Sequence, residues 1–156
     1  MRTLQEIVNK ADGFSRLKQA KIRIENSPHM PLVIQYLDKS GFNDSDYLRV
    51  SQLETIDGKF VRDTEICFEC DADGTNWKPV YWNSDITRKK IYVSQAFEVN
   101  DERCLNLIDM DVMRALKKWA DVWDEDLTTL GYLEATTSFA AGKGPENRQG
   151  NLLEAS

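Results

Sequence analysis

Short alternations of apolar and polar residues in the middle of the chain predict three neighbouring β-strands. The three runs, at about residues 65–70, 77–82 and 90–97, are rich in β-branched and aromatic residues and are separated by Asp, Gly, Asn and Ser. Because successive side chains of a strand point to opposite faces, the positions expected to face the core are Ile66, Phe68, Cys70, Ile91, Val93 and Phe97.

Upstream of these runs, the pattern predicts two more strands and a helical N-terminal segment. The strands are expected over residues 32–37 and 47–55, and Asp57-Gly58 after the second is typical of a tight hairpin turn. Thr3 and Glu6 have the spacing of a capping box at the start of a first helix. Residues 15–24 fit either a second helical stretch or the beginning of a strand.

Apolar residues at steps of three and four predict one long final helix. Asn100 or Asp101 is expected to cap it and Gly131 to end it. We expect this helix to cover one face of the sheet with Trp119 and Trp123 both buried, while its acidic residues, Asp124 included, face solvent. The apolar stripe comprises Leu105, Ile108, Val112, Leu116, Trp119, Trp123, Leu127 and Leu130.

These elements together predict an α+β fold. It has an N-terminal helical segment, an antiparallel sheet of four or five strands, and a long C-terminal amphipathic helix packed on the sheet. Residues 1–133 are predicted to form a single domain. Residues 134–156 are rich in Thr, Ser, Gly, Asn and Gln and are predicted to be a flexible C-terminal tail.

Composition and charge argue against several classes of protein, namely membrane, secreted and nucleic-acid-binding proteins. The longest apolar run is far shorter than the roughly 20 residues of a membrane span, so no membrane partner is expected. The first residues lack the apolar core of a secretion signal, and three cysteines are no disulfide framework, so a cytoplasmic location is expected. The formal net charge of −6 disfavours nucleic acid as a partner, because binding to phosphates depends on a positive field.

Several segments of the chain form a shared pattern: Arg23-Ile-Glu-Asn26, Met30-Pro-Leu-Val-Ile34, Asp57-Gly58, Arg62-Asp63 with Glu65, residues 77–85, and residues 118–127 with Gly131. Together they resemble a family of small proteins of unknown function that are carried on plasmids, conjugative elements and phages. The resemblance covers about residues 21–133 and implies a mobile-element accessory protein without a catalytic motif. The chain departs from the family pattern at Gln52-Leu53, where a His-Tyr pair is expected, and at Thr64, where a Pro is expected.

Two groups of residues suggest metal chemistry, and neither is assigned a catalytic or metal-binding role. Cys67 and Cys70 are three apart on a predicted strand and therefore point to opposite faces, which prevents them from converging on one ion. Asp63, Glu65 and Glu69, with Asp57 and Asp85 nearby, suggest a carboxylate-dependent or metal-dependent hydrolase as an alternative function. They lack the accompanying lysine of the commonest sheet-based nuclease pattern, so no cofactor is expected.

Three sets of residues are candidates for interaction or structure. Aromatic and basic residues of the sheet, Trp77, Tyr81, Arg88, Lys89 and Lys90, suit a protein interface or the stacking of nucleic-acid bases. The acidic helix residues Asp121, Asp124 and Glu125 suit a basic partner. Arg62 with Asp63, and Trp119 with Trp123, are expected to be structural.

The leading hypothesis from the sequence is a non-enzymatic protein that binds another protein. Its partner would be an unknown host-encoded or element-encoded protein, with the chain acting as an inhibitor or modulator of a host system. The first alternative is a nucleic-acid-binding protein that uses the sheet aromatics and basic residues, and the second is the hydrolase described above.

Overall fold

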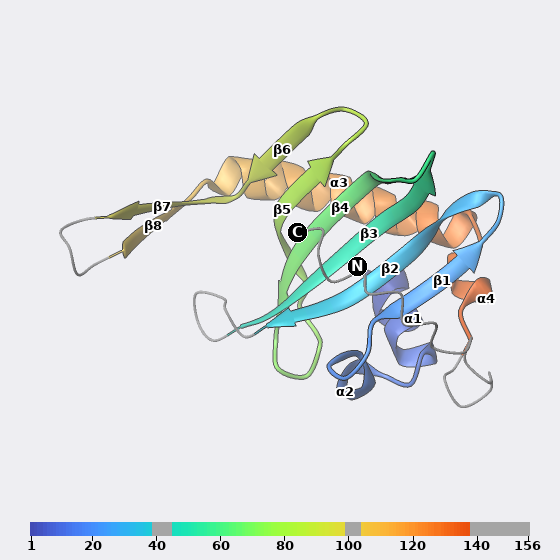
Figure 1. Ribbon diagram of the computed structural model, residues 1–156. Coiled ribbons are helices and arrows are strands. Elements are labelled where there is room, and N and C mark those ends of the chain that lie inside the picture. Colours follow the sequence, from blue (N-terminus) through green and yellow to red (C-terminus); the bar gives the residue numbers. More distant parts are fainter. Residues whose placement is uncertain (39–44, 99–103, 138–156) are drawn as a thin grey trace.

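Six antiparallel strands, each paired with the next one in the sequence, form the main sheet of the protein (Figure 1). The computed structural model describes residues 1–38, 45–98 and 104–137. The strands are β1 (Ile22–Asn26), β2 (His29–Asp38), β3 (Asp46–Ile56), β4 (Lys59–Cys70), β5 (Lys78–Ser84) and β6 (Lys89–Tyr92), and a separate ribbon is formed by β7 (Ser94–Glu98) and β8 (Cys104–Ile108). The helices are α1 (Arg2–Lys10), α2 (Phe14–Leu17), α3 (Met110–Thr129) and α4 (Tyr132–Ala135).

The predicted α+β class is confirmed, with six strands in the main sheet rather than four or five. The additional strand of the main sheet is β1, and the last predicted strand is also divided. The stretch that fitted either a helix or a strand gives the short helix α2 followed by strand β1, in which Ile22 and Ile24 are buried. The predicted strand over residues 90–97 is divided at Val93, so that β6 belongs to the main sheet and β7 to the ribbon.

The hydrophobic core lies between one face of the sheet and the helices. Ile34, Val50 and Ile66 from three adjacent strands are fully buried and belong to the same apolar cluster as residues of all four helices. Figure 1 shows α3 running across the back of the sheet. The helical contribution to this cluster comes from Leu4, Ile7, Val8, Leu17, Ala120, Trp123, Leu127 and Tyr132, with Phe14 packed against it.

Helix α3 begins later than the sequence pattern predicts. The side chain of Asp109 accepts hydrogen bonds from the backbone N–H groups of Asp111 and Val112, which makes Asp109 the N-cap. Leu105 and Ile108, assigned to the helical stripe from the sequence, instead lie on strand β8. The helix end is as predicted, because Gly131 follows it in the left-handed conformation with φ 88°.

One turn and one domain boundary complete the comparison with the predicted elements. Asp57 and Gly58 both have positive φ, and the hairpin predicted there joins β3 to β4. The predicted domain boundary at residue 133 falls inside α4, and residues 138–156 of the predicted tail lie outside the described residues. Within the described ranges, no helix has the length and apolar character needed to cross a bilayer.

Candidate functional site

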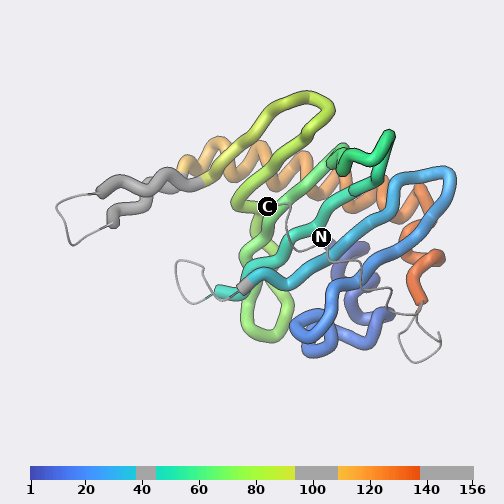
Figure 2. The backbone as a smooth tube through the Cα atoms, in the orientation of Figure 1, coloured from blue at the N-terminus to red at the C-terminus, as the bar shows by residue number. Residues whose placement is uncertain are grey.

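Strand β6 ends the main sheet and has no neighbour on its outer side in the described part of the chain. All four of its residues are exposed. The N–H of Val93 donates to the carbonyl oxygen of Val80 on β5 at 3.1 Å, so odd-numbered residues of β6 turn their backbone groups toward β5. By the alternation of an antiparallel ladder, the N–H and C=O groups of Lys90 and Tyr92 point away from the sheet. Figure 2 shows this hairpin, in yellow-green, at the margin of the sheet.

On the helix-covered face, β6 carries an apolar surface that continues onto α3. Ile91 lies opposite Trp82 in the ladder, so it is on the predicted face, but it is 39% exposed and is not buried there. The ring of Trp82 meets the ring of Trp119 edge to face, with 5.7 Å between centroids. Ile91 and Trp119 are therefore both neighbours of Trp82 on the helix-covered face.

Trp119 and Trp123 have different environments, although both were expected to be buried. Their rings stack with 6.1 Å between centroids. Trp123 is 7% exposed and belongs to the core, whereas Trp119 is 39% exposed and lies outside the core cluster. The exposed side of Trp119 is thus available for contact with another molecule.

The opposite face of β6 carries a pair of tyrosines. Tyr81 and Tyr92 are cross-strand partners, and their ring centroids lie 4.9 Å apart. Burial, followed by the proximity of Tyr92, Glu65 and Cys67, raises the pKa of Tyr81 to about 12, so its hydroxyl stays protonated and remains a hydrogen-bond donor at neutral pH.

Trp77, which the sequence grouped with Tyr81, lies instead in the core. It is 5% exposed, its ring centroid is 5.4 Å from that of Phe68, and its Nε1–H donates to the carbonyl oxygen of Gly74 at 2.7 Å. The interpretation of Trp77 as an interaction residue is therefore wrong. The turn between β4 and β5 directs this side chain inward, which alternation along the sequence did not reveal.

Three consecutive cations occupy the start of β6 and the turn before it. Arg88 has φ 54° in the turn, and Lys89 and Lys90 are the first residues of the strand. All three are exposed, and within the described ranges none of them forms an ion pair or a hydrogen bond through its side chain. We call the set Arg88, Lys89, Lys90, Ile91, Tyr92 and Trp119 the β6 edge surface.

Arg62 lies beside the β6 hairpin and pairs with two carboxylates. Its Nε is 3.1 Å from Oε2 of buried Glu65, and its Nη1 is 3.8 Å from Oδ2 of Asp85. The Asp85 N–H also donates to the carbonyl oxygen of Arg62, and the Arg62 N–H donates to Oδ2 of Asp85, which joins β4 to the residue after β5. Asp63, expected together with Arg62 to be structural, is not one of the two carboxylates that pair with Arg62.

The carboxylates that suggested a hydrolase do not gather at one point. Glu65 faces Arg62, and Glu69 accepts a hydrogen bond from the hydroxyl of Tyr47 at 3.0 Å. Burial is the main cause that raises the pKa of Tyr47 to about 12. In the described ranges no group of three or more His, Cys, Asp or Glu side chains is placed to hold a metal ion.

The two strand cysteines point to different faces, as alternation predicted. Cys70 is 3% exposed and belongs to the core, while Cys67 is partly exposed on the other face. Burial, with a smaller contribution from Glu65, raises the pKa of Cys67 to about 11. Neither position therefore offers a reactive thiolate at neutral pH.

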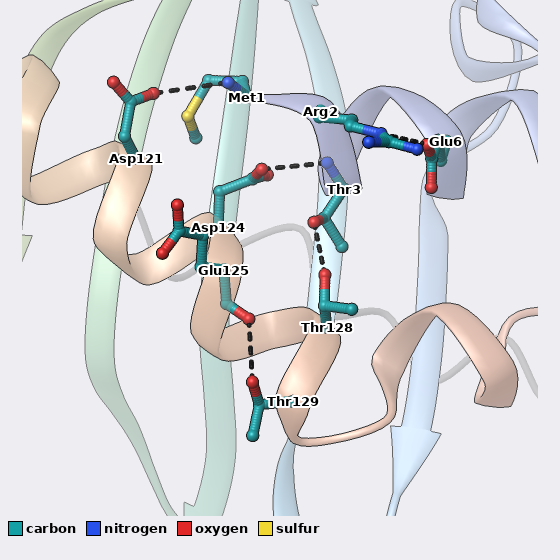
Figure 3. A pocket seen from close by; sticks show the side chains of 9 residues that line it. All are labelled: Met1, Arg2, Thr3, Glu6, Asp121, Asp124, Glu125, Thr128 and Thr129. Atoms are coloured by element: carbon teal, nitrogen blue, oxygen red, sulfur yellow. Dashed lines mark hydrogen bonds and ion pairs between the residues drawn. The ribbon is translucent and has the colours of Figure 1, made fainter.

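The acidic residues of α3 divide into a structural and an exposed group (Figure 3). Asp124 is 4% exposed and accepts the N–H groups of Thr3 and Leu4, so the prediction that it faces solvent as an interaction residue is wrong. Burial opposes ionisation of Asp121, but Lys117 and the Met1 ammonium together lower its pKa. Glu125 is exposed.

A cleft of about 670 Å³ is lined by these acidic residues and by the N-terminus of α1. The predicted capping box of α1 is absent, because the helix starts at Arg2 and the hydroxyl of Thr3 contacts that of Thr128. Asp124 supplies the cap from another helix instead. Four of the lining residues, Thr3, Asp121, Asp124 and Thr128, are thus already engaged in contacts between α1 or Met1 and α3.

A buried hydrogen-bond network connects α3, α4 and the sheet, and sequence reasoning missed it. Trp123 Nε1–H donates to Oε1 of Gln52 at 3.0 Å, and Nε2 of Gln52 donates to the hydroxyl of Tyr132 at 3.1 Å. The Tyr132 hydroxyl in turn donates to the carbonyl oxygen of Met30. The only signal in the sequence was Gln52 itself, which departs from the pattern of the resembling family.

The chain was compared with known proteins and structures. A family model described as Domain of unknown function (DUF6908) matches residues 2–133, which include every element from α1 to the first residues of α4. No curated protein and no solved structure matches the chain.

Proposed function

The chain belongs to the family described as Domain of unknown function (DUF6908), and on this premise we propose that it is a non-enzymatic protein that binds another protein through the β6 edge surface. One observation supports the proposal above all. An edge strand with free backbone groups lies between exposed apolar side chains, Ile91 and Trp119 on one face and Tyr92 on the other. Exposed apolar side chains together with an open strand edge are typical of protein interaction sites.

The proposed biological role rests on the sequence resemblance alone. Its resemblance to small proteins carried on plasmids, conjugative elements and phages supports an accessory role in a mobile element. The partner would then be a host protein, or another protein of the element, whose activity is inhibited or modulated.

Affinity capture with matched variants tests this function. The tagged protein is incubated with nuclease-treated lysate of the host, washed with salt, and the retained proteins are quantified by mass spectrometry. We expect one stoichiometric partner that is lost when Ile91→Asp and Trp119→Ala are combined. Ile56→Asp is the control, because Ile56 is 45% exposed on the β3–β4 hairpin, away from β6. Retention that is unaffected by the double variant would contradict the proposal.

A second candidate function is the binding of single-stranded nucleic acid. The observation in its favour is the Tyr81–Tyr92 ring pair, which lies on the same face as Lys90 and offers stacking beside a cation. Fluorescence anisotropy with single-stranded oligonucleotides at increasing salt separates the two functions. Nucleic-acid binding predicts affinity that falls steeply with salt and weakens in the Lys89→Glu, Lys90→Glu variant.

A further inference from the structure

We propose that the partner contributes an extended acidic segment that joins the sheet as an additional strand beside β6. This inference rests on the proposed function and specifies the chemistry of the partner. It follows from three properties of the β6 edge surface: its backbone groups, its charges and the order of its side chains.

The backbone of β6 provides the pairing groups. The N–H and C=O groups of Lys90 and Tyr92 point outward, and two residues of a strand span about 7 Å, so they match the hydrogen-bonding repeat of a second extended chain. A helical segment has no free backbone groups along its length to pair with them. The partner segment is therefore extended, as in other cases of strand addition to a sheet edge.

The charge of the surface selects the sign of the partner. Arg88, Lys89 and Lys90 are exposed and without an ion pair in the part of the chain that is described, although the whole chain has a net charge of −6. Carboxylates of a partner would give these cations the counter-charges that the described residues do not place there. A nucleic acid would meet the same three cations but would leave the outward backbone groups of Lys90 and Tyr92 unpaired.

The order of side chains along β6 predicts an order along the partner. Lys89 and Lys90 come first and point to opposite faces, and Ile91 and Tyr92 follow, again on opposite faces. Cross-strand neighbours interact most strongly, so two acidic residues should lie opposite the lysines and two apolar residues opposite Ile91 and Tyr92. An antiparallel segment then reads apolar, apolar, acidic, acidic, and a parallel segment reads in the reverse order.

Selection from a random library of displayed eight-residue peptides tests the inference. We expect the wild-type protein to enrich peptides with the two-apolar, two-acidic block. Affinity for a selected peptide should fall at least about tenfold in the Lys89→Glu, Lys90→Glu variant. Lys21→Glu is the control, because Lys21 is an exposed cation next to β1 at the opposite edge of the sheet, and it should leave the affinity unchanged.

Hydrogen exchange of individual amides tests the mode of binding. Saturating peptide should slow exchange of the Lys90 and Tyr92 amides at least about tenfold, because they become paired, while the Val93 amide, already bonded to Val80, changes little. Bound peptide with unchanged exchange at Lys90 and Tyr92 would overturn strand addition.

The outcomes distinguish this inference from the proposed function. If selection enriches no acidic block, or the charge-reversed variant binds the peptides equally well, the acidic strand is wrong. A captured protein that still depends on Ile91 and Trp119 would then leave the protein-binding function standing. If single-stranded oligonucleotides displace the peptides and nothing is captured after nuclease treatment, both are overturned.

Discussion

The carboxylate of Asp124 accepts the backbone N–H of Thr3 at 2.9 Å, across 121 positions of sequence. Its other oxygen accepts the N–H of Leu4, also at 2.9 Å. Helix α3 therefore supplies the N-terminal cap of α1, in a position that is almost fully buried.

Removal of this cap should destabilise the whole domain. Asp124→Ala leaves two buried N–H groups without an acceptor, so we expect the free energy of unfolding to fall by about 2–4 kcal/mol in urea titrations. Asp124→Asn keeps one acceptor oxygen and should cost less. Exposed Asp126 provides the control, since Asp126→Ala should change stability by less than about 0.5 kcal/mol. Equal effects at the two positions would contradict the capping role.

Gln52 should contribute to stability because its side chain joins Trp123 and Tyr132 in one buried hydrogen-bond network. Gln52→Leu removes the acceptor for Trp123 Nε1–H and should cost about 1–3 kcal/mol of stability, measured by chemical denaturation. Exposed Gln19 is the control, and Gln19→Leu should be nearly neutral. In combination with Tyr132→Phe, the effect of Gln52→Leu should be non-additive, because both residues belong to one network.

Gly74 should be less replaceable than Gly58, although both have positive φ. A Cβ at Gly74 would lie 2.6 Å from Cγ of Phe14, whereas a Cβ at Gly58 would meet nothing within 4 Å. Gly58→Ala should therefore cost only the conformational strain of about 1–2 kcal/mol, and Gly74→Ala distinctly more. When the two substitutions are repeated in a Phe14→Ala variant, the difference between their stability costs, measured by thermal unfolding, should shrink. If it persists, the contact with Phe14 is not its cause.

Cys67 should react slowly with alkylating agents in the folded protein. With its pKa raised to about 11, labelling by iodoacetamide at pH 8 should be at least about tenfold slower than that of a free thiol. A Cys104→Ser variant, followed by peptide mass analysis, isolates the signal. Denatured protein, in which Cys67 labels at the free rate, serves as the reference.

The raised pKa of Cys67 also makes the stability of the fold depend on pH in the alkaline range. The folded state binds the Cys67 proton more tightly than the unfolded chain, whose thiol titrates near 9. The corresponding stabilisation is complete below about pH 9 and is lost as the pH rises toward 11, so unfolding midpoints should decline over this range. Cys67→Ala should flatten the decline.

Helices and strands whose apolar residues follow a single period could be predicted from the sequence. Contacts between elements that are distant in the sequence could not. The alternation at Ile66 and Phe68 gave the correct buried face of β4, and Gly131 gave the correct end of α3. Leu105 and Ile108 fit helical spacing as well as a strand, and only the Asp109 cap and the pairing of β8 with β7 exclude the helix there.

The residues of the candidate site could likewise be predicted from the sequence only in part. The basic residues Arg88, Lys89 and Lys90 were recognisable because they are consecutive. The exposure of Trp119 and the burial of Trp77 and Asp124 depend on what the fold places opposite each side chain. A carboxylate on a helix has the same appearance in the sequence whether it faces water or caps a second helix.

The strand order also determines how the protein can assemble during translation. Each strand of the main sheet pairs with its predecessor, so the sheet can grow hairpin by hairpin as the chain leaves the ribosome. Helix α1 is made first, yet its cap arrives only when Asp124 has been synthesised. Until then the apolar face of Ile34, Val50 and Ile66 lacks the cover of α3. Closure of the core is consequently a late event, and it depends on the segment that is made after the sheet.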